Sequence, residues 1–87
     1  MANSYLPETL RAIAMNEARM GTLITDLTRS VDILTADIEH EEARAGVRDL
    51  ADPAYPVLAS TLRRRRENIG ATIASLQALI HEAPTAA

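Results

Sequence analysis

Cysteine, phenylalanine and tryptophan are absent from this chain of 87 residues, which also has no lysine and only two tyrosines. Without cysteine the chain has no disulfides, no thiolate metal sites and no cysteine nucleophile. A domain this short normally needs a cross-link, a metal or a partner to supplement its core. Because the apolar residues are mainly Leu, Ile, Val, Met and Ala, the composition favours helix packed on helix over a sandwich or barrel.

Long apolar runs are missing as well. No stretch is long enough to span a bilayer, and the N-terminus lacks the basic region and apolar core of a secretion signal. We therefore expect a cytoplasmic protein without a membrane partner. The net charge of −3 weighs against general nucleic-acid binding. All nine cationic residues are arginine, which favours bidentate ion pairs.

A heptad pattern dominates the first half of the chain. Steps of alternately four and three residues from Leu6 visit twelve positions, of which ten are apolar and two are Glu17 and Glu41. The visited positions are Leu6, Leu10, Ile13, Glu17, Met20, Ile24, Leu27, Val31, Leu34, Ile38, Glu41 and Ala45. A repeat of 3.5 residues is the period of a left-handed coiled coil. The pattern predicts one continuous helix over residues 5–45.

Helix-breaking residues gather at 46–55, which we predict to be a turn. A second helix is predicted over 56–82, ended by Pro84 and followed by a frayed tail at 83–87. Its apolar stripe is Leu58, Leu62, Arg65, Ile69, Ile73, Leu76 and Ile80. The predicted fold is therefore all-α: a single two-helix domain forming an antiparallel helical hairpin with coiled-coil packing. Tyr55 is expected to pack across the hairpin end, with presentation to a partner as the alternative.

The two predicted helices differ in length, at about 60 and 40 Å. Antiparallel pairing through the turn places Ile80 near Thr22 and Arg65 near Asp37. About fifteen residues, 6–20, then project past the second helix with an uncovered apolar seam. Their burial would contribute about 25 cal/mol per Å² of apolar surface. The unequal hairpin therefore predicts association.

We favour a homodimeric four-helix bundle, with a larger oligomer or a different helical protein as alternatives. The interface candidates of the first helix are Leu6, Leu10, Ile13, Met20, Ile24 and Leu27. A strip of small residues on the second helix suits the close approach of another helix: Gly70, Ala74 and Ala78.

Four consecutive arginines are the one feature that resembles an anion-binding patch: Arg63, Arg64, Arg65 and Arg66. Consecutive helical residues point in directions spread over about 300°, so the run surrounds the helix and forms no stripe. The acids that face it in the antiparallel hairpin are Asp37, Glu39, Glu41 and Glu42. We expect ion pairs within the assembly, Arg65 with Glu41 or Asp37 first, and keep binding of an external anion as the alternative. No aromatic residue interleaves with the run to stack on bases.

Catalytic patterns are weak throughout the chain. Asp37 and His40 have the spacing of half a carboxylate-bridged iron site, but Gly70 stands where the second helix would need its histidine. No nucleophile motif or phosphate-binding glycine loop is present. We expect no cofactor, no metal and no enzyme activity. The sequence indicates a non-catalytic structural or interaction subunit, such as a helical adaptor, assembly factor or chaperone-like protein; the alternative is a polyanion-binding module that uses the arginine run.

Overall fold

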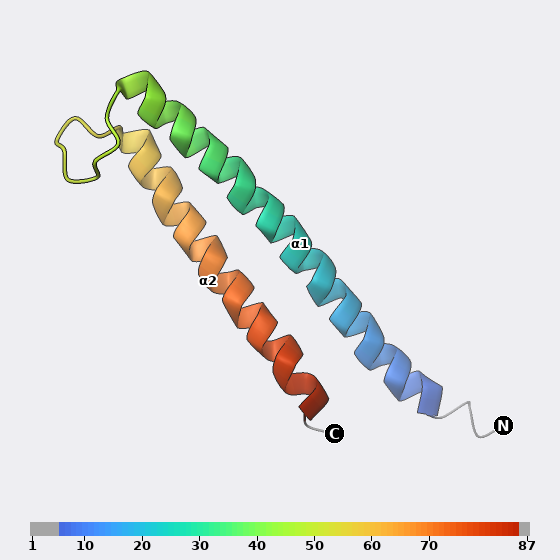
Figure 1. Ribbon diagram of the computed structural model, residues 1–87. Helices are drawn as coiled ribbons and strands as arrows, with labels where there is room; N and C mark the ends of the chain where they lie inside the picture. The colour runs from blue at the N-terminus through green and yellow to red at the C-terminus, as the bar shows by residue number, and fades with distance from the viewer. Residues whose placement is uncertain (1–5, 86–87) are drawn as a thin grey trace.

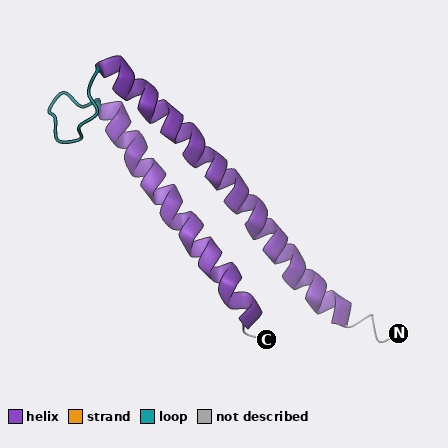
Figure 2. Ribbon diagram, viewed as in Figure 1, coloured by secondary structure: helices purple, strands orange, loops and turns teal. Residues whose placement is uncertain are grey.

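The computed structural model describes the backbone of residues 6–85 and the side chains of residues 8–81. Two helices, α1 (Leu6–Ala45) and α2 (Val57–Thr85), run antiparallel and side by side (Figure 1). A loop joins them at one end, and the described residues contain no strand (Figure 2). The all-helical hairpin predicted from the sequence is confirmed.

The inner face of α1 follows the predicted heptad. Its buried and half-buried seam residues are Met20, Ile24, Leu27, Val31, Leu34, Ile38 and Glu41. Residues 8–19 are all exposed, including the seam residues Leu10 and Ile13. The first part of α1 therefore lacks a packing partner within the hairpin, as the unequal helix lengths predict.

Gly46 ends α1. Its φ of 72° lies in the left-handed region, which glycine adopts without the steric cost that a Cβ brings. The amides of Gly46 and Val47 both donate to the carbonyl of Glu42, at 2.8 and 3.3 Å. These bonds satisfy a carbonyl that the helix itself leaves without a partner.

Two successive turns opened by aspartates form the loop. The amide of Asp52 donates to the carbonyl of Asp49, and that of Tyr55 donates to the carbonyl of Asp52. The side chains of both aspartates accept a further backbone amide, from Ala51 at 2.9 Å and from Ala54 at 2.8 Å. Each aspartate thus stabilises its turn from the side chain, and the second turn brings Tyr55 back onto the helices.

The inner face of α2 differs from the predicted stripe at its start. The observed inner positions are Ala59, Leu62, Arg66, Ile69, Ile73, Leu76 and Ile80, with Arg63 half-buried beside them. Leu58 is 52% exposed and Arg65 is exposed, so the prediction was wrong at these two positions. The hairpin turns the smaller Ala59 inward in place of Leu58.

The C-terminal boundary also differs. α2 continues through Pro84 to Thr85, beyond the predicted end near residue 82. A proline in the last turn removes only one hydrogen bond at a helix end that has few left to lose.

The core is small and lies at the turn end. Within the described residues only Leu34, Ile38, Tyr55 and Ala59 are buried apolar side chains. The Cα atoms extend over 68 × 19 × 12 Å, and the two helices lie side by side. The hairpin is thus a single layer, whereas a stable domain is normally built from at least two packed layers.

Candidate interaction surface

Large apolar side chains remain exposed along the whole hairpin. Nine of them are exposed by 45–82%: Leu10, Ile13, Met15, Leu23, Ile33, Leu50, Val57, Leu58 and Leu79. They outnumber the four buried apolar residues. Single exposed leucines are ordinary on protein surfaces, but an exposed set larger than the core is a feature of interaction sites.

The accessible surface of the chain gives the same result in area. It amounts to 6627 Å², whereas a compact monomer of this mass, 9.4 kDa, exposes about 5,000 Å². The chain thus exposes more surface than a compact monomer of its mass, as expected for two helices that pack only against each other.

One shallow groove runs between the two helices. Its floor is apolar, and Asp37 and Arg65 carry its only charges. It is lined by Ser30, Ile33, Leu34 and Asp37 of α1 and by Leu62, Arg65 and Ile69 of α2. Because both helices contribute, the groove is a property of the folded hairpin and presents one acid and one base beside exposed Ile33.

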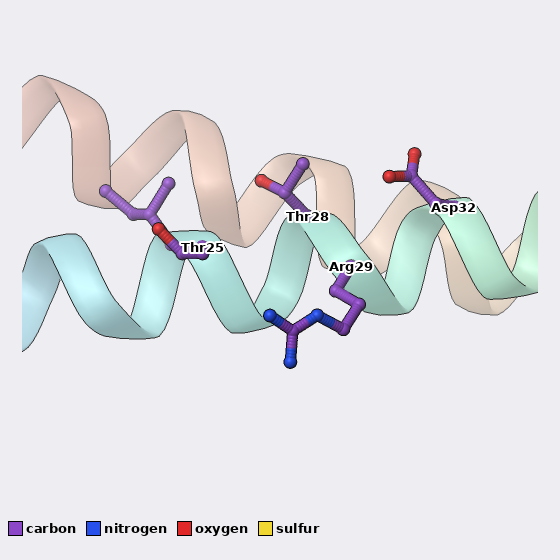
Figure 3. Close-up of a pocket in the computed structure, with 5 residues that line it drawn as sticks. Thr25, Thr28, Arg29 and Asp32 are labelled. Atoms are coloured by element: carbon purple, nitrogen blue, oxygen red, sulfur yellow. The ribbon is translucent and has the colours of Figure 1, made fainter.

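A second depression lies on α1 alone. It is lined by Ile24, Thr25, Thr28, Arg29 and Asp32, which share one side of the helix (Figure 3). The Arg29 guanidinium points away from the Asp32 carboxylate (Figure 3). One helix cannot enclose a ligand, so this depression is part of the open helix surface.

A polar cluster closes the turn end on the opposite edge of the helix pair. We call Glu42, Tyr55 and Arg63 the turn-end triad. The Tyr55 hydroxyl donates to Glu42 Oε2 at 2.8 Å and accepts from Arg63 Nε at 2.7 Å, while Arg63 Nη2 donates to the same Glu42 oxygen at 2.8 Å. The Arg63 guanidinium carbon also lies 5.8 Å from the centre of the Tyr55 ring. The prediction that Tyr55 packs across the hairpin end is confirmed.

The triad changes the acidity of its members. The hydrogen bond from Arg63, and then that from Tyr55, lowers the pKa of Glu42 against the opposing effect of burial. The hydrogen bond to Glu42 raises the pKa of Arg63 in turn. Arg48 adds a weak, exposed contact to Glu42 at 3.9 Å. The Glu42 side chain is 5% exposed and that of Arg63 is 29% exposed, so the triad contains a partly buried ion pair.

The remaining arginines of the run have different surroundings. Arg66 donates to the Thr35 hydroxyl at 3.1 Å across the hairpin, and Arg64 and Arg65 are exposed. Among the described residues no ion pair joins Arg65 to Asp37 or Glu41, and Glu41 instead pairs with Arg44 at 2.6 Å within α1. Within the hairpin, the ion pair that joins the two helices is Arg63 with Glu42.

The sequence placed Glu42 among the acids that face the arginine run but did not single it out, because it lies one position beyond the seam. For Tyr55, by contrast, the sequence did contain a heptad signal. Steps of three and four residues taken backward from Ile69 reach Arg66, Leu62, Ala59 and then Tyr55, which places Tyr55 in line with the inner face of α2.

The predicted interface residues fall into three groups. Met20, Ile24 and Leu27 are half-buried against α2, whereas Leu10 and Ile13 are exposed. The side chain of Leu6 lies outside the described residues. Gly70, Ala74 and Ala78 are exposed on α2. A Cβ added at Gly21 or Gly70 would meet no atom within 4 Å, so neither glycine is needed for the packing of α1 on α2.

Metal and membrane sites find no support in the part of the chain that the structure describes. No three His, Asp or Glu side chains there gather closely enough to hold a metal ion, and His40 is exposed. Neither helix has an apolar stretch that would cross a membrane.

Comparison of the chain with known protein families, with curated proteins and with solved structures found no significant match.

Proposed function

We propose that this protein is a non-catalytic interaction subunit that self-associates through its helical surface as a homodimeric four-helix bundle. The observation that carries the proposal is that only four apolar side chains are buried, whereas nine large apolar side chains are exposed. The two helices form a single layer. A second hairpin supplies the missing layer.

The exposed start of α1 supports association over most of the hairpin length. Leu10 and Ile13 continue the heptad seam beyond the part that α2 covers. An uncovered coiled-coil seam is completed by another helix with the same spacing, and a second copy of α1 provides one. A helical adaptor, assembly factor or chaperone-like protein would act through such a surface.

Sedimentation equilibrium and light scattering over a range of micromolar concentrations test the proposal. We expect a mass twice the 9.4 kDa of the chain and a midpoint of thermal unfolding that rises with protein concentration. A particle of single-chain mass with a sharp, concentration-independent transition would contradict self-association.

Binding of a polyanion by the arginine run is the alternative function. The observation that favours it is the exposure of Arg64 and Arg65, although Arg63 and Arg66 are engaged within the hairpin. Binding to duplex DNA at low salt, weakened by Arg64→Gln with Arg65→Gln and by added salt, would support it. Absence of binding at low salt would remove it.

A further inference from the structure

We propose that a second copy of this chain docks on the groove between the helices, with its two-fold axis parallel to them, so that Asp37 of each copy pairs with Arg65 of the other. The inference rests on the proposed self-association and specifies its surface and register. It starts from the level at which the two helices face each other.

The hydrogen bond from Arg66 to Thr35 fixes that level, and the groove shared by Asp37 and Arg65 agrees with it. One heptad from Asp37 toward the start of α1 reaches Ser30, and two reach Leu23. Because α2 runs the other way, the same steps from Arg65 reach Thr72 and Leu79. The two rims of the groove are therefore Leu23, Ser30 and Asp37 on α1 and Leu79, Thr72 and Arg65 on α2.

These rims match level by level. Leucine stands across from leucine, a hydroxyl residue from a hydroxyl residue, and an acid from a base. Both leucines are exposed, by 45% and 54%, and no ion pair joins Asp37 to Arg65 within the described hairpin. The matched groups are thus available to another molecule.

A two-fold axis along the helices places α1 of one copy over α2 of the other at the same level. Leu23 then meets Leu79 of the second copy, Ser30 meets Thr72, and Asp37 meets Arg65, each contact occurring twice. The exposed Ile33 of each copy fills the groove of the other. The turn-end triad lies outside the groove and uses its charges within the hairpin.

An axis perpendicular to the helices does not give this match. It would stack α2 on α2, and the α2 rim, Arg65, Thr72 and Leu79, contains no acid to receive Arg65. Charge complementarity therefore selects the parallel axis.

A charge-swap mixture tests the register. Asp37→Arg and Arg65→Asp each place like charges at both symmetric contacts, so each variant alone should dimerise at least about tenfold more weakly at low salt. Mixed in equal amounts, the two variants should recover a heterodimer of wild-type affinity, since every contact then joins Arg to Asp. Asp32→Arg and Arg64→Asp, exposed and outside the groove, are the matched controls and should leave affinity unchanged. Circular dichroism shows whether each variant remains helical.

Disulfide trapping tests the same register without charges, since the chain has no cysteine of its own. Oxidation of Leu23→Cys mixed with Leu79→Cys should give mainly the mixed dimer, and Thr25→Cys mixed with Ala78→Cys should give little. Dimers that form without charge-swap recovery, or that cross-link Leu23→Cys to itself, would overturn this register but leave self-association intact. A chain that is monomeric at every concentration would overturn both.

Discussion

Glu42 and Arg63 lie 21 residues apart in the sequence and meet at 2.8 Å across the hairpin, with the Tyr55 hydroxyl bonded to both. The backbone carbonyl of the same Glu42 accepts the two amides that follow the end of α1, those of Gly46 and Val47. One residue thus joins the end of α1, the loop and the first turns of α2.

Removal of a member of the triad should destabilise the hairpin. Tyr55→Phe deletes the hydroxyl and should lower the free energy of unfolding by about 1 kcal/mol. Glu42→Gln should cost more, because it leaves Arg63 without its counter-charge in a mostly buried site. Urea unfolding at one fixed protein concentration measures both. Glu41→Gln, whose partner Arg44 is 70% exposed, is the control, and an equal loss in both glutamine variants would contradict the role of the triad.

Acid should weaken the hairpin through Glu42. Its pKa in the folded state is lowered below the ordinary value of 4.5, so its contribution to stability is fully present above that value. As the pH falls through the folded pKa the carboxylate becomes protonated and the contribution disappears. Urea midpoints measured from neutral pH down to about pH 3 should fall more steeply for the wild type than for Glu42→Gln. Parallel curves would show that Glu42 is not responsible.

Substitution of two isoleucines of α1 distinguishes the core of the hairpin from its proposed interaction surface. Ile38 is 1% exposed, and Ile38→Ala should lower the free energy of unfolding by about 2–5 kcal/mol. Ile33 is 56% exposed, so Ile33→Ala should leave the dilute monomer nearly unchanged yet weaken self-association. Urea unfolding and sedimentation on the same samples distinguish the effects. Equal dimer affinity in Ile33→Ala and wild type would argue against docking on the groove.

Substitution by alanine should lower the stability of the hairpin at Gly46 and raise it at the two glycines within the helices. Gly46→Ala forces a Cβ into the left-handed conformation and should destabilise the hairpin by about 1 kcal/mol. Gly21→Ala and Gly70→Ala meet open space in helices and should each stabilise it by about 0.5–1 kcal/mol. Thermal unfolding measures all three. If either helical variant stabilises the hairpin but weakens association, that glycine belongs to an interface between copies.

The periodic parts of this fold were readable from the sequence. Ten apolar positions in register gave α1, and the cluster of Gly46, Asp49 and Asp52 gave the turn, because each effect is local. The register of α2 was not determined locally, since Leu58 and Ala59 both continue the stripe. The choice depends on the loop, which brings the Tyr55 hydroxyl within hydrogen-bond distance of Glu42, and that is a tertiary property.

The candidate surface was predictable in part for the same reason. Unequal helix lengths implied that Leu10 and Ile13 would be uncovered. The groove was not predicted, because it depends on which residues of α2 stand level with Ser30 and Asp37. Consecutive helical residues point in different directions, so an error of one residue at Arg65 moves a side chain from the inner face to the rim.

The buried side chains all gather near the loop, whereas the opposite end of the helix pair holds only half-buried contacts. Thermal opening should consequently begin at the free ends and proceed toward the loop, with amide hydrogen exchange slowest around Ile38 and Ala59. In the proposed dimer, the free ends would separate and re-pair with another chain while the loop end stays shut, so subunits would exchange without global unfolding.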